Sequence, residues 1–273
     1  MNTRNIITQV RERLDAIREK VLELGRSLLL EDSRLFKVNL KGAVDLVTEH
    51  DLRIESALNT ALSKLFPGDE LIFEEGSRRS GDSAFTWVID PIDGTTNFST
   101  GLPHFCISVG LCYAQRPVAG LIYDPSKDHL FEGIVGDGLW LNQSLQSVSD
   151  TKLLDHALLA TGFAYDRRVR DDNNVPEMDY MLRRCRGIRR MGAAALDLAY
   201  VSVGWLDGYW EYRLKPWDFA AGWACVLAGG GKYTQLDGGA ASMDDFNVCA
   251  TNGVFHEELI SALNESPRIF GTT

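Results

Sequence analysis

The chain has 273 residues, of which 45% are hydrophobic and 24% charged, so it can bury a core without disulfides or a structural metal. Its formal net charge of −10 disfavours direct nucleic-acid binding, and its five cysteines form no Cys-x-x-Cys pair that would indicate a thiolate zinc site. Because the sequence also lacks an apolar run long enough to cross a bilayer, we expect a cytoplasmic protein without membrane contact.

The first 70 residues predict two helices. Apolar residues recur every three or four positions over residues 6–30, which predicts a long amphipathic helix. Residues 31–43 are polar and turn-like. Thr48 and Asp51 then have the spacing of a capping box, and the helix that they begin is expected to stop at Pro67.

Short apolar runs bounded by Gly, Ser and Asp predict buried strands over residues 71–73, 85–89, 105–113, 118–123, 130–135 and 139–141. After about residue 150, strands over 157–161, 209–214, 231–235 and 248–250 alternate with helices over 193–203, 219–227 and 257–264, and residues 166–177 form a polar loop or short helix. We therefore expect an α+β half over residues 1–150 and an α/β half over 151–273, packed as one compact unit.

The segment from Trp87 to Phe98 has a pattern suited to binding a cation beside an anion. A buried strand is expected to end at Asp90, because Pro91 removes a backbone donor. Asp93 follows three residues later, so a tight turn can direct both carboxylates at one point, and Gly94 lets the N–H groups of a following helix approach a phosphate. Carboxylates without His or Cys suit Mg²⁺ better than zinc. The simpler alternative is a strand end with an Asx turn and a helix N-cap.

Other acidic residues could complete this site. Glu74 and Glu75 follow a predicted strand, where adjacent glutamates often lie only on a solvated edge. If that strand pairs with the strand ending at Asp90, Glu74 reaches the same pocket. Asp218 stands near the start of an apolar helix after Pro216, where it is either a plain N-cap or a further ligand.

Basic residues and histidines give weaker indications. The five histidines are scattered, and none has metal-ligand spacing. A basic run comprises Arg183, Arg184, Arg186, Arg189 and Arg190. This run is either a solvated helix face and loop, or a dimer contact or lid over an anionic substrate.

At these residues the chain resembles the inositol monophosphatase family. The run Asp90–Phe98 matches the first signature of that family, and Trp217–Gly222 is similar to the second. The resemblance extends from about residue 6 to residue 253 and includes Val44–Thr48 with Asp51, Glu74–Glu75 and Gly192–Leu196. It implies a layered αβαβα sandwich of the inositol monophosphatase and fructose-1,6-bisphosphatase type. It also implies a lithium-sensitive phosphatase that uses two or three Mg²⁺ ions and forms a homodimer.

The resemblance also assigns roles to individual residues. The metal ligands would be Glu74, Asp90, the Ile92 carbonyl, Asp93 and Asp218. The substrate would contact Asp93, the backbone of Gly94, Thr95 and Thr96, and the residues Ala194, Glu211 and Lys215. Thr95, hydrogen-bonded to Asp51, would orient the attacking water together with Glu74. Lys215 stands where animal members of the family typically have a histidine.

The implied reaction is hydrolysis of the phosphomonoester of a small polyol or sugar, foremost inositol-1-phosphate. The sequence has no Cys-x₅-Arg, GxxxxGK[ST] or GxGxxG pattern at a suitable place, which disfavours a cysteine phosphatase and nucleotide-driven transfer. The alternatives within the class are fructose-1,6-bisphosphatase and histidinol-phosphatase activity. An alternative of another kind is a regulatory protein that binds the transcription or RNA-processing machinery, as some bacterial members of the family do.

Overall fold

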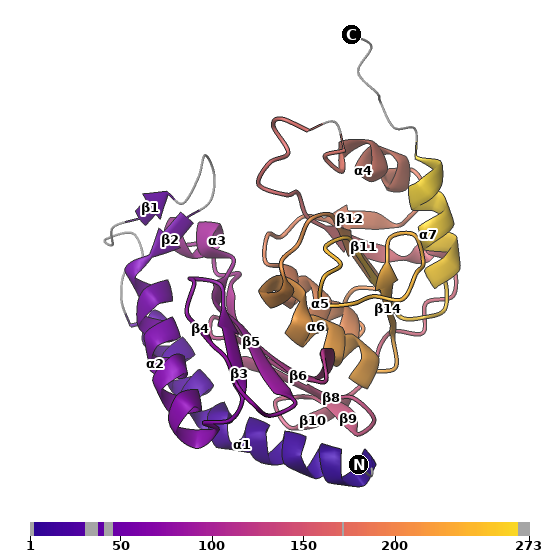
Figure 1. The fold of residues 1–273 in the computed structure, drawn as a ribbon. Coiled ribbons are helices and arrows are strands. Elements are labelled where there is room, and N and C mark those ends of the chain that lie inside the picture. The colour runs from indigo at the N-terminus through magenta and orange to yellow at the C-terminus, as the bar shows by residue number, and fades with distance from the viewer. Residues whose placement is uncertain (1–2, 31–37, 41–45, 171, 267–273) are drawn as a thin grey trace.

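The computed structural model describes residues 3–30, 38–40, 46–170 and 172–266, which form two β-sheets in alternating layers with helices (Figure 1). Helices α1 (Thr3–Leu28) and α2 (Glu49–Leu65) contact one face of an eight-stranded sheet. Helices α5 (Ala194–Ser202) and α6 (Pro216–Ala228) contact both sheets and so form the middle layer. Helices α4 (Val175–Leu182) and α7 (His256–Glu265) contact the five-stranded sheet. The expected αβαβα sandwich is confirmed.

The eight-stranded sheet precedes the five-stranded sheet in the chain. Its spatial order is β10 (Ser144–Gln146), β9 (Gly138–Leu141), β8 (His129–Ile134), β7 (Arg116–Asp124), β6 (Cys106–Tyr113), β5 (Phe85–Asp93), β3 (Glu70–Phe73) and β4 (Arg78–Arg79). The second sheet has the order β12 (Gly187–Arg189), β11 (Leu158–Thr161), β13 (Gly208–Glu211), β15 (Val248–Thr251) and β14 (Lys232–Gln235). A separate pair joins β1 (Val38–Leu40) to β2 (Leu46–Thr48). That residues 1–150 and 151–273 are the two halves of one unit stays a prediction.

The longer predicted elements are confirmed, with boundaries within a few residues. The capping box is present: Thr48 Oγ1 accepts from the Asp51 N–H, and the Asp51 carboxylate accepts from the Thr48 N–H. Strand β5 was expected to end at Asp90 but runs to Asp93, because its pairing with β6 resumes after an irregularity that contains Pro91. Of the turn-like stretch 31–43, residues 38–40 form β1 and the others lie outside the described residues.

The sequence patterns missed the shortest strands. Strands β4, β10 and β12 have two or three residues each, too few for an alternating pattern to stand out. Part of the basic run lies in β12 rather than on a helix face. Within the described residues, no helix has both the length and the apolar composition needed to cross a bilayer.

Helix α6 packs close to the eight-stranded sheet through a row of glycines. Gly110, Gly120 and Gly133 lie opposite one another on the adjacent strands β6, β7 and β8. A Cβ atom on Gly120 would lie 2.1 Å from the carbonyl oxygen of Ala221 in α6, which is far inside van der Waals contact. The glycine row therefore fixes how deeply α6 lies on the sheet.

We predict that Gly120→Ala lowers the free energy of unfolding by roughly 1–3 kcal/mol, because the added methyl group forces α6 away from the sheet. Chemical denaturation monitored by circular dichroism measures the change. Gly187→Ala is the matched control, since its Cβ would meet nothing closer than 3.6 Å. Equal stability of the two variants would contradict the close approach.

Candidate functional site

Two parallel strands bring the first carboxylates together. Strands β3 and β5 are parallel and pair with Phe73 opposite Ile89. The next residues, Glu74 and Asp90, therefore lie side by side at the carboxyl-terminal side of this pairing. The Glu74 N–H donates to the Ile89 carbonyl at 3.1 Å, and Glu74 lies close enough to Asp90 for its charge to raise the pKa of Asp90. The structure thus confirms the strand pairing on which the inclusion of Glu74 depended.

The N-termini of the two middle-layer helices supply the other contacts. Asp93 accepts hydrogen bonds from the N–H groups of Ala194 and Ala195, at 3.2 Å and 2.7 Å, where α5 begins. Asp218 lies in the first turn of α6, and its Oδ2 accepts from the Lys215 N–H at 2.7 Å. The positive ends of both helix dipoles therefore face the acidic cluster and favour its negative charge.

Burial and mutual repulsion make these carboxylates hard to ionise. Burial raises the pKa of Asp90 well above its usual value, and the charges of Glu74, Asp93 and Asp218 raise it further. Burial also raises the pKa of Asp218 well above its usual value and that of Asp93 to about 6, although N–H donors from α5 oppose the shift at Asp93. A bound cation would remove this penalty, so the cluster is electrostatically suited to one.

The donor set fits a hard divalent cation, because it consists of carboxylate oxygens without sulfur or imidazole. Among the described residues, however, no three His, Cys, Asp or Glu side chains already have the spacing that holds a single ion. Asp218 Oδ2 instead accepts from the Lys215 N–H at the start of its own helix.

The loop after Asp93 has the expected turn and helix. Gly94 is left-handed, with φ of 90°, and α3 (Thr95–Thr100) begins directly after it. The predicted hydrogen bond between Thr95 and Asp51 is not present: the Thr95 hydroxyl donates to the Ile92 carbonyl at 2.9 Å. A hydroxyl has one proton to donate, and Asp51 is fully buried in its capping box, where Thr48 donates to it.

A cavity of about 640 Å³ lies over the carboxylate cluster. It is lined by all of the predicted site residues except Asp51, namely Glu74, Asp90, Ile92, Asp93, Gly94, Thr95, Thr96, Ala194, Glu211, Lys215 and Asp218. Lining residues that the sequence interpretation did not place here include Tyr165, Arg167, Asp197 and Arg213. Arg190 also lines the cavity. It belongs to the basic run, and among these additional lining residues it alone had been singled out in the sequence.

A sequence profile of the inositol monophosphatase family matches residues 9–268. The chain belongs to this family. An inositol-1-monophosphatase from Synechocystis sp. is 39% identical over 259 residues, which cover 94% of this chain and 90% of that protein. The Nus factor SuhB of Escherichia coli is 38% identical over 213 residues, or 78% of this chain and 80% of that protein. The structure of inositol monophosphatase from Anabaena has a TM-score of 0.88 and 37% identity, covering 96% of this chain and 98% of that chain.

Members of the inositol monophosphatase family are phosphatases that hydrolyse phosphomonoesters of small molecules and generally depend on metal ions. This chain is therefore a phosphoric monoester hydrolase. The acidic cavity combines hard oxygen donors with the start of α3.

Glu211 gives this inositol monophosphatase family member a pH-dependent element on the cavity wall. Burial raises its pKa from 4.5 to about 7, although a hydrogen bond from the Tyr209 hydroxyl opposes the shift. A carboxyl whose pKa is raised on folding stabilises the fold below its unfolded pKa, and this contribution is lost as the pH rises through the folded value.

We predict that, without divalent ions, the free energy of unfolding of Glu211→Gln increases relative to that of the wild type by roughly 3 kcal/mol when the pH is raised from 4 to 8. The reason is that the amide cannot ionise, whereas the buried wild-type carboxyl does. Denaturant unfolding at both pH values tests this. Glu258→Gln, at an exposed glutamate of α7, is the control. A stability difference for Glu211→Gln that does not change with pH would rule out the buried ionisation.

Proposed function

We propose that this phosphatase hydrolyses the monophosphate ester of a small polyol, foremost inositol-1-phosphate, with Mg²⁺ as its metal. The proposed metal ligands are Glu74, Asp90, the Ile92 carbonyl, Asp93 and Asp218. The observation that carries the proposal is that these four carboxylates line one cavity, three of them with pKa values raised by burial. The curated relative from Synechocystis, an inositol-1-monophosphatase, supports the choice of substrate.

When two or three Mg²⁺ ions are bound, they supply Lewis acidity and positive charge for a phosphate dianion. The chain's own groups position the reactants. The N–H groups of Gly94, Thr95 and Thr96 bind the phosphate oxygens, and Gly94 keeps that surface open because it has no side chain. Glu74 and the Thr95 hydroxyl orient the attacking water. Since Ile92 takes the Thr95 proton, the Thr95 oxygen accepts a hydrogen bond from that water.

Other cavity residues contact the polyol in this proposal. Glu211 accepts hydrogen bonds from substrate hydroxyls, Ala194 lines the same wall, and Lys215 lies beside the leaving group. Asp51 supports Thr95 from behind the site in this proposal: its Oδ2 atom accepts from Thr48 in the capping box, and Asp51 is buried. A cytoplasmic homodimer without membrane or direct nucleic-acid contact completes the proposal, and the net charge of −10 supports the last point.

A second candidate function follows from the relatives in Escherichia coli and Salmonella typhimurium that are named Nus factor SuhB, each 38% identical. It is a regulatory role through a protein of the transcription machinery. The two functions are compatible, because a protein partner can bind outside the cavity. Recovery of RNA polymerase with a folded, Mg²⁺-binding protein that releases no phosphate would favour the regulatory role.

We predict Mg²⁺-dependent phosphate release that is highest with inositol-1-phosphate, abolished by EDTA and inhibited by Li⁺. The measurement is phosphate release from a panel of inositol-1-phosphate, fructose-1,6-bisphosphate, histidinol phosphate and adenosine 3′,5′-bisphosphate. Highest release from another panel member would replace the substrate but keep the site. Equal release with EDTA would contradict the metal proposal.

Two variants, each of which removes one carboxylate, compare the proposed site with a position outside it. Asp93→Asn is expected to abolish turnover, because it removes a metal ligand while nearly preserving side-chain volume. Asp179→Asn changes an exposed carboxylate on α4 that is not part of the cavity lining and is expected to leave turnover unchanged. Wild-type turnover by a folded Asp93→Asn variant would remove Asp93 from the proposed ligand set.

A further inference from the structure

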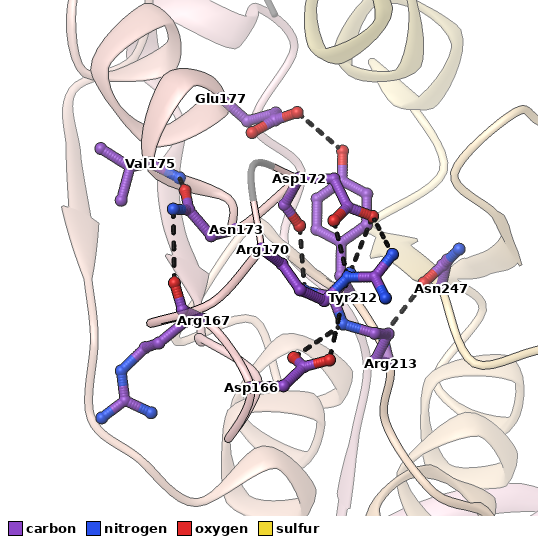
Figure 2. A network of polar contacts seen from close by, with 10 residues as sticks. All are labelled: Asp166, Arg167, Arg170, Asp172, Asn173, Val175, Glu177, Tyr212, Arg213 and Asn247. Carbon is purple, nitrogen blue, oxygen red and sulfur yellow. Dashed lines mark hydrogen bonds and ion pairs between the residues drawn. The ribbon is translucent and has the colours of Figure 1, made fainter. Parts of the chain in front are cut away.

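Arg213 is the centre of a polar network at the cavity (Figure 2). Its Nε donates to Asp166 Oδ1 at 3.0 Å, its Nη1 donates to Asp172 Oδ2 at 2.9 Å, and its Nη2 donates to the Asp172 carbonyl at 2.9 Å. Arg170 bonds to the same carboxylate, with Nε 2.8 Å from Asp172 Oδ1. One guanidinium thus holds both ends of the segment that carries Asp166 and Asp172.

The backbone of Arg213 has a strained conformation, which its contacts hold in place. Its φ is 59°, in the left-handed region that residues with a Cβ atom rarely adopt. Its N–H donates to Asn247 Oδ1 at 3.0 Å, and the next residue, Leu214, donates to the Phe246 carbonyl at 2.8 Å. Strain of this kind persists only where surrounding contacts hold it, and it is often found at functional sites.

The segment that Arg213 holds forms one wall of the cavity. Residues 162–165 and Arg167 line the cavity, and Arg213 itself does so from the opposite segment. The Arg167 carbonyl accepts from Asn173 Nδ2 at 3.4 Å, which links Arg167 to the part of the chain beside Asp172. The position of Arg167 therefore depends on the Arg213 network.

Arg167 differs from the other arginines of the network in its own contacts. Its Nη1 donates to the Ala164 carbonyl at 3.2 Å, and among the described residues no carboxylate forms an ion pair with it. By contrast, Arg170 and Arg213 both bond to Asp172. A guanidinium has five N–H donors, so Arg167 keeps donors that can bind oxygen atoms of a molecule in the cavity.

We propose that Arg213 is a positioning residue that holds the wall segment over the cavity, so that Arg167 contacts oxygen atoms of the non-reacting part of the substrate. The inference rests on the proposed phosphatase function and adds two residues that determine how tightly the polyol phosphate binds. Neither residue touches the reacting atoms in this account. Loss of either one weakens substrate binding more than it slows the chemical step.

Arg213→Gly is the sharpest variant, because glycine adopts a φ of 59° without strain and only the side chain is lost. We expect KM for the best panel substrate to rise about tenfold, which corresponds to the loss of one hydrogen bond to a charged group. We expect kcat to stay within about twofold of the wild-type value. Arg167→Gln is expected to have the same effect. The double variant is expected to be no worse than either single variant, since both remove one contact.

The hold of Arg213 on the wall segment through Asp166 and Asp172 is called the clamp below. Carboxylate variants separate the effect of the clamp from simple charge attraction. Asp166→Ala combined with Asp172→Ala removes the side-chain acceptors of Arg213 together with two negative charges. By long-range electrostatics alone, this loss of charge would lower KM for an anionic substrate. The clamp instead predicts a rise in KM, as in Arg213→Gly. Asp179→Asn, which breaks the exposed 3.2 Å pair with Arg183, is the control and leaves KM unchanged.

Limited trypsin digestion gives a measurement that does not depend on substrate. Arg168 and Arg170 are exposed in the wall segment, so cleavage after them reports whether the segment is held. We expect cleavage there to be at least about tenfold faster in Arg213→Gly than in wild type or Asp179→Asn, because the clamp is lost. Mass spectrometry of the fragments identifies the cut sites.

The two readouts distinguish failure of this inference from failure of the proposed function. A wild-type protein that releases no phosphate from any panel substrate would overturn the proposed function, while faster cleavage in Arg213→Gly would still support the clamp. Unchanged cleavage and unchanged KM in Arg213→Gly would overturn the clamp. Additive KM effects of Arg213→Gly and Arg167→Gln would overturn the claim that Arg213 acts through Arg167.

Discussion

The site depends on the close contact between α6 and the eight-stranded sheet. Because Gly110, Gly120 and Gly133 have no side chains, the helix can lie directly on strands β6, β7 and β8. Because α6 lies this deep, its first turn places Asp218 in the cavity that Asp90 lines from β5. The proposed ligand set is thus completed by backbone packing between two segments that are far apart in the chain.

The same geometry has an electrostatic consequence. Four carboxylates in one cavity repel each other, and burial raises the pKa values of Asp90, Asp93 and Asp218. The N-termini of α5 and α6 offset part of this penalty through the N–H groups that Asp93 and Asp218 accept from. A cation would offset the rest, so the fold stores an unfavourable interaction that ligand binding relieves. This stored interaction is the physical basis for expecting a tight dependence on metal.

Much of this arrangement could be predicted from sequence, and the exceptions have physical reasons. The capping box of Thr48 and the strand before Glu74 follow from local patterns, and local patterns are visible in one sequence. The glycine row was not predicted, because its three members are neighbours only through strand pairing. Nor was the role of Arg213, since its left-handed backbone and its partners Asp166 and Asp172 are set by tertiary contacts. The family resemblance suggested a bond between Thr95 and Asp51, whereas the Thr95 hydroxyl donates to the Ile92 carbonyl three residues earlier in the chain.

The most direct test of this account is a crystal structure with Mn²⁺ in place of Mg²⁺, with the ion located by its anomalous scattering. The account predicts bound Mn²⁺ in the cavity with oxygen ligands from Asp90, Asp93 and Asp218. The last of these ligands is decisive, because it reaches the cavity only through the packing of α6 on the glycine row. Mn²⁺ bound without Asp218, or bound only outside the cavity, would contradict the account.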